Sequence, residues 1–284
     1  MLAAKRRRVI ASISVSASVM LVGILLAAPP VAGVTFASPE RSAHRACVPW
    51  RIVPVPARDG AITGLSGLAT DDVWAVGDLY PAKNHPVFVH WDGRRWQAVE
   101  HPTTNDDLYV GISAISSSDV WAVGSGLTNG LTLKPVVQHW DGTSWTIVPI
   151  DRLPPGASGL FSDVAGTSTD DVWAVGQYTL QDGSGGTLAE HWDGLAWHRM
   201  KADVGALDSV TAISPDDVWA SGGGNTPATA HWDGTTWTLL RPSQPRFGAL
   251  FDITAIPSHE LWAVGEGDNG GPLQPLTEFS QPCR

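Results

Sequence analysis

The chain has 284 residues and an acidic balance, with 28 aspartates and glutamates against 18 lysines and arginines, for a formal net charge of −10. A chain of this charge is repelled by phosphate backbones, so we expect no nucleic-acid partner. The 30 glycines and 21 prolines suit short strands joined by many turns.

The first 37 residues differ from the rest. Residues 5–8 are basic, residues 9–28 are apolar or small, and small residues such as Ala32 and Ala37 follow. This order predicts a secretory signal over residues 1–37, a linker over residues 38–46 and a secreted, extracellular protein. The alternative is an uncleaved anchor, because about 20 apolar residues span a bilayer, and only then do we expect a membrane partner. Cleavage would leave 14 basic and 28 acidic residues, a net charge of −14.

A tryptophan-centred phrase, Asp-Val-Trp-Ala-Val-Gly or a close variant, recurs along the chain. Its tryptophans are Trp74, Trp121, Trp173, Trp219 and Trp262, which are 47, 52, 46 and 43 residues apart. A second phrase, His-Trp-Asp-Gly-x-x-Trp, begins at His90, His139, His191 and His231. A period of this length indicates one architectural unit per repeat, and it indicates no particular activity.

Each repeat divides into four short strands, as residues 109–149 illustrate. Strands are predicted over residues 109–115, 120–124, 136–140 and 145–149, separated by a polar turn, a loop rich in glycine and threonine, and the hairpin signal Asp141-Gly142. Four antiparallel strands in about 45 residues are typical of a propeller blade. The tryptophans are then expected to fill the space between neighbouring blades.

The last repeat ends without a fourth strand, and we expect that strand at the other end of the chain. Residues 50–54, Trp-Arg-Ile-Val-Pro, copy residues 145–149, Trp-Thr-Ile-Val-Pro. We therefore expect residues 50–55 to pair with residues 276–280, with Phe279 in the place of the tryptophan of His-Trp-Asp-Gly. The predicted fold is an all-β, monomeric, five-bladed β-propeller of four-stranded antiparallel blades over residues 47–284, closed by the N-terminal strand.

Cys47 and Cys283 are the only cysteines of the chain and lie at the two ends of the repeat region. Because an exported chain meets an oxidising environment, we expect a disulfide between them, standing where other blades have the Asp-Gly turn. It would close a loop of nearly the whole domain, which is worth about 4 kcal/mol on the chain-entropy model. Two free thiols are the alternative.

The two repeated phrases make residues 47–283 similar to secreted bacterial β-propeller proteins with kelch- or galactose-oxidase-like repeats. The resemblance implies the fold and no single activity, because such repeats occur in proteins with many functions. A copper site of the galactose-oxidase kind is not expected. The chain has only Tyr80, Tyr109 and Tyr178 as tyrosines, and both cysteines are assigned to the disulfide.

The fixed turns and the variable loops are predicted on opposite faces, because alternate connections of an up-and-down sheet emerge at alternate ends. Variable loops on a rigid frame are where binding residues usually lie, although neutral variation of exposed loops is the alternative. The candidate ligand-binding residues are Tyr80, Tyr178, Asp182 and Phe247. The expected ligand is a glycan, a peptide or a cell-surface protein.

The repeated histidines are not expected to bind a metal. Packed sheets stand about 10 Å apart, whereas zinc needs its nitrogen ligands at about 2 Å. Each histidine is instead predicted to form a hydrogen bond within its own blade.

Aspartates near the start of the inner strands form a second candidate site. Asp163 and Asp252 occupy equivalent positions and Asp208 is offset by one, while the first two blades have Gly64 and Gly111 there. Three carboxylates at the mouth of a channel could hydrolyse a glycoside or hold a calcium ion, and capping of turns is the third interpretation. No other cofactor is expected. We predict a binding module rather than an enzyme, with a five-bladed glycoside hydrolase as the alternative.

Overall fold

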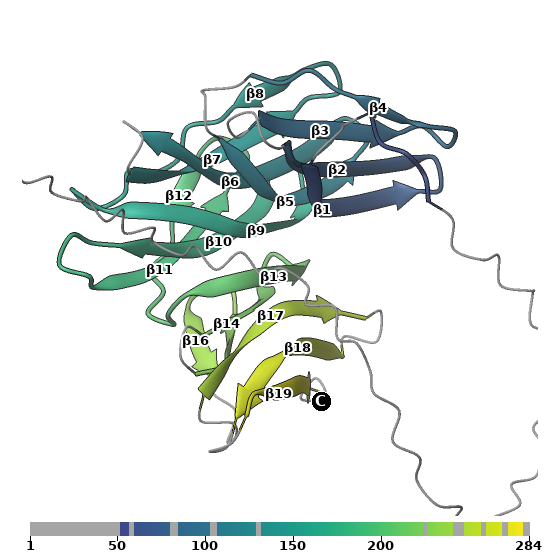
Figure 1. The fold of residues 1–284 in the computed structure, drawn as a ribbon. Coiled ribbons are helices and arrows are strands. Elements are labelled where there is room, and N and C mark those ends of the chain that lie inside the picture. Colours follow the sequence, from purple (N-terminus) through teal and green to yellow (C-terminus); the bar gives the residue numbers. More distant parts are fainter. Residues whose placement is uncertain are drawn as a thin grey trace, which may run out of the picture. The chain divides into compact units, whose positions relative to one another are not determined.

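The computed structural model describes residues 52–56, 60–79, 85–102, 107–128, 132–223, 226–240, 247–256, 260–268 and 272–280, which form five antiparallel sheets (Figure 1). Sheet 1 contains β1 (Gly60–Ala69), β2 (Asp72–Leu79), β3 (His85–Trp91) and β4 (Trp96–Ala98). Sheet 2 contains β5 (Leu108–Ser116), β6 (Asp119–Thr128), β7 (Thr132–Trp140) and β8 (Trp145–Ile147). Sheet 3 contains β9 (Ser158–Ser168), β10 (Asp171–Thr179), β11 (Gly185–Trp192) and β12 (Trp197–Arg199).

Sheet 4 contains β13 (Leu207–Ser214), β14 (Asp217–Gly222), β15 (Ala228–Trp232) and β16 (Trp237–Leu240). Sheet 5 contains β17 (Phe247–Ala255), β18 (Leu261–Asp268) and β19 (Gln274–Ser280). In every sheet the strands lie side by side in chain order. No helix of the described part has the length and apolar character that a membrane span requires.

The second repeat shows how well the sequence pattern predicts the strands. β5, β6, β7 and β8 lie over the four predicted segments, and β6 and β7 extend further toward the loop between them. Residues 119–126 of β6 are all buried, which accounts for the apolar character of both faces of this strand.

In sheets 1 to 4 the two fixed turns touch each other, so they share one face, as predicted. In sheet 2, Asp141 Oδ1 accepts hydrogen bonds from the backbone N–H groups of Thr143 at 2.8 Å and Ser144 at 2.9 Å. Gly142 has a φ of 92°, and a Cβ there would lie 2.8 Å from the Cβ of Ser118 in the other turn. Glycine is therefore required at this position. We call this end of the sheets the turn face, and the opposite end, with the variable connections, the loop face.

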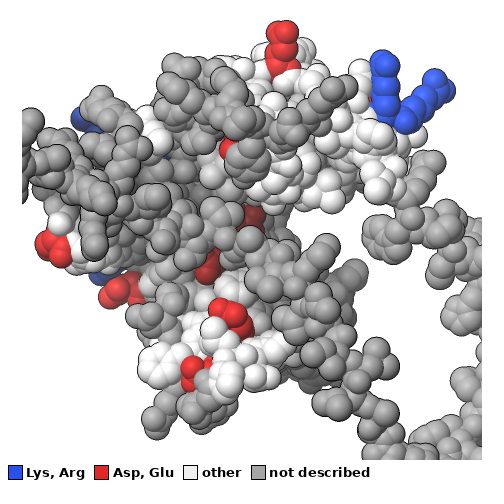
Figure 2. All heavy atoms as spheres, in the orientation of Figure 1, with Lys and Arg blue, Asp and Glu red and all other residues white. Residues whose placement is uncertain are grey.

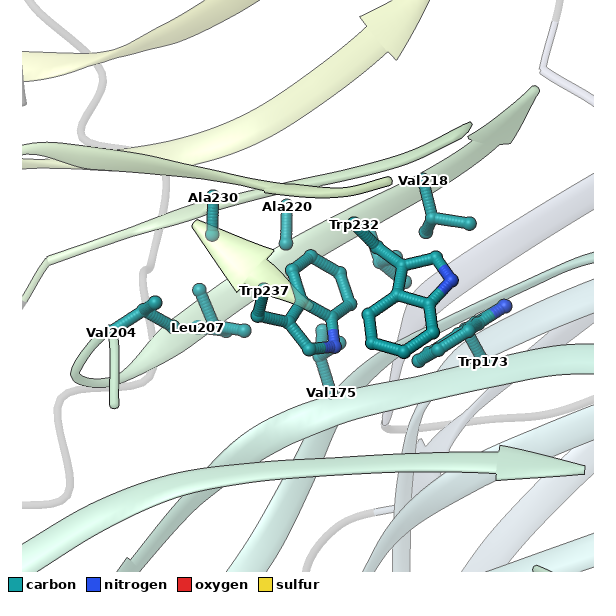
Figure 3. Close-up of a cluster of buried hydrophobic side chains, with 10 residues drawn as sticks. Trp173, Val175, Val204, Leu207, Val218, Ala220, Ala230, Trp232 and Trp237 are labelled. Atoms are coloured by element: carbon teal, nitrogen blue, oxygen red, sulfur yellow. The ribbon is translucent and has the colours of Figure 1, made fainter. Parts of the chain in front are cut away.

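Neighbouring sheets pack together through tryptophans, and contacts join β1 to β5, β5 to β9, β9 to β13 and β13 to β17. Between sheets 3 and 4, Trp173 is fully buried, with its ring centroid 5.0 Å from that of Trp232 and 5.5 Å from that of Trp237. Figure 3 shows these three rings with the surrounding aliphatic side chains. Trp74, Trp121 and Trp173 of the first phrase thus fill the space between sheets, as predicted. Trp219 is partly exposed and Trp262 is 43% exposed, so the prediction does not hold for these two.

The expected closure of a five-bladed ring of four-stranded blades is wrong. Among the described residues sheet 5 has three strands, and residues 52–55 belong to no strand. Ile52 is 96% exposed, whereas its expected counterpart in β8, Ile147, is 44% exposed. A side chain that is almost wholly in solvent makes none of the packing contacts that hold a fourth strand in the other sheets. Cys47 and Cys283, like residues 1–46, lie outside the described residues.

The last strand is also displaced by one position from the prediction. Trp262 pairs with Phe279 as Trp74 pairs with His90, so Phe279 takes the place of the histidine, and the place of the next tryptophan falls to Ser280. The ring centroids of Trp262 and Phe279 are 4.8 Å apart. The expectation that Phe279 replaces the tryptophan is therefore wrong.

Candidate functional site

Each inner strand carries a β-bulge at the same place, and the bulge decides which residue faces the neighbouring sheets. The extra residues are Thr63, Val110, Ser162, Asp208 and Phe251, as the interrupted registers of the five pairs show. The residues that follow them are Gly64, Gly111, Asp163, Ser209 and Asp252. A bulge inserts one unpaired residue and re-aims the side chains beside it. Asp163 and Asp252 are equivalent, as predicted, but their partner in sheet 4 is Ser209, because Asp208 occupies the bulge.

Asp163, Ser209 and Asp252 form a chain of contacts across sheets 3, 4 and 5. Ser209 Oγ lies 2.9 Å from Asp163 Oδ2 and 2.9 Å from Asp252 Oδ1. Asp163 also accepts hydrogen bonds from the backbone N–H groups of Val164 at 2.8 Å and Val210 at 2.9 Å. A hydroxyl has one hydrogen, so Ser209 donates to one carboxylate while the other contact needs a proton on the second carboxyl group.

Burial raises the pKa of Asp163 to about 6, against the opposing effect of the N–H groups of Val210 and Val164 and of the Ser209 hydroxyl, while the Asp252 charge adds to the rise. Asp208 is separate from this chain, and burial raises its pKa as well. The predicted trio is thus a linked pair, Asp163 and Asp252, with a third carboxylate apart. Ser209 was missed, although it lies ten positions before Trp219, as Asp163 lies before Trp173.

Metal binding and acid–base chemistry make different demands on this chain of contacts. In the described part of the chain no group of three or more histidine, cysteine or acidic side chains is arranged to hold a metal ion. Asp163 has both oxygens engaged by N–H or O–H donors, which suits a link between sheets. A paired carboxylate with a pKa near neutrality is also what a general acid requires.

The loop-face candidates divide between sheets 3 and 5. Tyr178 is partly exposed on β10, with its ring over Gly186 of β11. Asp182 is exposed in the turn between β10 and β11, where its Oδ1 accepts hydrogen bonds from the N–H and Oγ of Ser184. Phe247 is 58% exposed at the start of β17. Tyr80 lies outside the described residues.

The repeated histidines make the hydrogen bond within their own sheet that the sequence predicts. In sheet 3, His191 Nε2 lies 2.8 Å from Asp171 Oδ1, and the histidine ring stacks on Trp173 with centroids 4.4 Å apart. Asp171 Oδ1 also accepts from Trp173 Nε1 at 3.2 Å. The equivalent aspartate–histidine pairs in sheets 1, 2 and 4 are 2.8, 2.9 and 2.9 Å long. These hydrogen bonds join the second and third strands of sheets 1 to 4.

A buried carboxylate on β11 was not foreseen. Glu190 is fully buried, and its carboxylate receives Arg199 of β12 at 3.2 Å and the backbone N–H of Asp151 at 3.2 Å. Burial raises the pKa of Glu190 to about 7, against the opposing effect of Arg199. The signal was available, since the residue before the repeated histidine is Gln138 in sheet 2, Glu190 in sheet 3 and, with the corrected register, Glu278 in sheet 5.

The sequence matches no protein-family profile and no curated protein, but solved structures match its fold. A protein of unknown function from Dyadobacter fermentans is 12% identical, with 81% of each chain covered and a TM-score of 0.53. YCF48 bound to a D1 peptide is 17% identical, with 78% of this chain covered and a TM-score of 0.50. This chain spans 66% of that YCF48 chain, just under two thirds of its length.

A fungal lectin from Aleuria aurantia, a six-bladed β-propeller with a fucose recognition mode, is 14% identical, with 77% of this chain and 74% of that chain covered and a TM-score of 0.46. The protein has an all-β propeller fold. The predicted count of five four-stranded blades is wrong, because the described residues form four four-stranded sheets and one three-stranded sheet.

Proposed function

We propose that the protein is an exported binding protein that takes a glycan or a peptide on its loop face. The observation that carries this proposal is the contrast between the two faces. On the turn face, the repeated side chains bond to one another, as Asp171, His191 and Trp173 do. On the loop face, the connections differ in every sheet and present exposed groups such as Asp182 and Phe247. Exposed, variable loops on a rigid frame are suited to binding.

The solved structures with similar folds are consistent with such a role, since one is a fucose-binding lectin and another holds a peptide. A peptide or glycan also suits the surface charge. Figure 2 shows acidic side chains scattered over the described surface of one face, with basic side chains projecting mainly from one corner. This distribution supports a partner other than nucleic acid.

Export is part of the proposal and rests on the character of residues 1–37. In an oxidising compartment Cys47 and Cys283 would form a disulfide. Mass spectrometry of the secreted chain without reduction should find one peptide pair that contains both cysteines. Two separately alkylated thiols would contradict this part of the proposal and leave the binding role untouched.

The binding role is tested with paired substitutions of exposed side chains. The exported protein is screened against a glycan array and a peptide library, and any ligand found is titrated against Phe247→Ala, Tyr178→Ala and Asp182→Ala. Leu195→Ala is the matched control, because Leu195 is 87% exposed in the fixed turn of sheet 3. We expect at least one loop-face substitution to lower the affinity for the ligand about tenfold or more, and we expect the control to leave the affinity unchanged. A ligand that responds to Leu195→Ala alone would place the site on the turn face.

The second candidate function is glycoside hydrolysis by the linked carboxyl groups. It is favoured by the common contact of Asp163 and Asp252 with Ser209 and by the Asp163 pKa of about 6. Such chemistry needs an acid and a nucleophile or base near each other. Chromogenic glycosides are the substrates to test. Turnover that Asp163→Asn and Asp252→Asn abolish, while both variants keep the circular dichroism spectrum of the folded protein, would favour the enzyme over the binding protein.

A further inference from the structure

The outer edge of β19 lies beside a cavity of about 220 Å³ between sheets 4 and 5. The lining includes Trp219 of sheet 4 and Glu278, Phe279 and Ser280 of β19. Among the described residues β19 pairs with β18 alone. A strand edge with backbone groups available for pairing and a partly apolar cavity therefore occur at one place.

In sheets 2, 3 and 4 the equivalent place holds the fourth strand, which begins with a tryptophan. The ring of this tryptophan stands edge-on to the tryptophan of the preceding sheet. The centroid distances are 5.7 Å for Trp145 and Trp74, 5.4 Å for Trp197 and Trp121, and 5.5 Å for Trp237 and Trp173. Trp219 is the next member of this series, and the cavity lies against it. The groove is therefore shaped for an aromatic side chain on an extended strand.

The carboxylate of Glu278 in the groove indicates a second side chain of the strand that would bind there. Glu278 pairs with Ala263 as Glu190 pairs with Ala174, so the two glutamates are equivalent. Glu190 receives Arg199 from its fourth strand, two residues after Trp197. Oε1 of Glu278 is buried and has no hydrogen-bond partner in the described structure, and burial raises the pKa of this carboxyl group. A cation at the same register would satisfy it.

The backbone supports the same register. In sheet 3 the N–H of Met200, the residue after the fourth strand, donates to the carbonyl of Ala189 at 2.9 Å. The equivalent carbonyl in sheet 5 belongs to Thr277, since Thr277 pairs with Val264 as Ala189 pairs with Val175. An incoming strand can therefore use the hydrogen-bond pattern that the other sheets already display.

We propose that this groove binds an extended peptide of another protein as a fourth strand antiparallel to β19. The peptide has a tryptophan opposite Ser280 and an arginine or lysine two residues later, opposite Glu278. We place the occupant in trans because Ile52, the described residue that the chain's own N-terminal segment would bring opposite Glu278, is 96% exposed. The site is separate from the loop face, so it stands or falls independently of the function proposed above.

The probe is a fluorescently labelled peptide, Gly-Trp-Thr-Arg-Val-Pro, titrated by anisotropy against the full exported chain. We expect saturable binding that falls about tenfold or more when the peptide tryptophan is replaced by alanine. Glu278→Gln should weaken the binding of the arginine peptide by a similar factor. The same substitution should not change the binding of a peptide that has valine in place of arginine. Glu266→Gln is the control for net charge, because Glu266 lies on β18 and does not line the cavity. Phe247→Ala should leave peptide binding unchanged.

Four results would overturn the proposal. The first is no binding at millimolar peptide. The second is binding that is indifferent to both the peptide tryptophan and Glu278. The third is a tenfold gain in peptide affinity on Trp50→Ala, which would show that the chain's own segment competes for the groove. The fourth is a dimer in sedimentation that the peptide dissociates, which would assign the groove to a second copy.

Discussion

The junction of sheets 3 and 4 and the junction of sheets 4 and 5 each contain the tryptophan of the first phrase, but this tryptophan is packed to different extents in the two. In the first, Trp173 is fully buried against Trp232 and Trp237. In the second, Trp219 is partly exposed and Ser280 takes the place of the first partner. Among the described residues no fourth strand supplies the other partner. Trp173 therefore stabilises the fold, whereas the equivalent residue Trp219 lines a cavity. Sequence repetition alone does not distinguish these two roles.

The largest expected effect comes from removing the tryptophan at each junction. Trp173→Ala should lower the free energy of unfolding by about 3 to 5 kcal/mol, because it removes a fully buried ring and leaves a cavity. Trp219→Ala should cost less, about 1 to 2 kcal/mol, because part of that ring already faces a cavity and solvent. Urea unfolding followed by circular dichroism measures both. Equal losses would show that the second junction is as complete as the first.

The linked carboxyl groups should give stability a distinctive dependence on pH. Burial raises the pKa of Asp163 from 3.8 to about 6, so between about pH 4 and 6 the folded protein holds a proton that the unfolded chain has released. Stability therefore falls as pH rises through this window. Asp163→Asn should remove this pH dependence. The change in the free energy of unfolding across the window is at most about 3 kcal/mol, at about 1.4 kcal/mol per pKa unit.

The matched control for this experiment is Asp182→Asn on the loop face. Hydrogen bonds from Ser184 lower the pKa of Asp182, so this change should leave the window between pH 4 and 6 unaltered. The measurement is the free energy of unfolding in urea at half-unit steps of pH. A slope that is identical in the Asp163→Asn variant and the intact protein would contradict the assignment.

A smaller difference is expected from the aspartate that orders each turn. Asp171 accepts hydrogen bonds from His191, Thr167 and Trp173, which lower its pKa although burial raises it. Asp171→Asn should cost about 1 to 2 kcal/mol at pH 7, since Asn offers one acceptor oxygen in place of two. Glu260→Gln, at the equivalent place in sheet 5, should change stability by less than about 0.5 kcal/mol. A scan of thermal unfolding at pH 7 would show whether the two variants differ.

The sequence predicts the strands and fixed turns well because their signals are local. Asp141-Gly142 requires a hairpin whatever surrounds it, and the tryptophan phrases recur with the pattern of a buried strand. The register of Phe279 and the bulge at Asp208 were not predicted. Both features depend on which residues of the adjacent strand form pairs with the strand in question. A shift of one position changes these pairs but leaves the local composition unchanged, so the sequence pattern does not reveal it. The same limit concealed the partnership of Asp163 with Ser209.

The contact between the two turns has a consequence for how such a chain can change in length. The glycine at position 142 leaves no room for a Cβ beside Ser118, so an inserted residue at that end would force the turns apart. The second tryptophan accordingly lies six positions after the histidine in each of the four complete repeats, as Trp145 does after His139. The differences among spacings of 47, 52, 46 and 43 residues all arise on the loop face. Insertions and deletions among the repeats are therefore confined to the loop face, where added residues leave the packing of the sheets and the fixed turns unchanged.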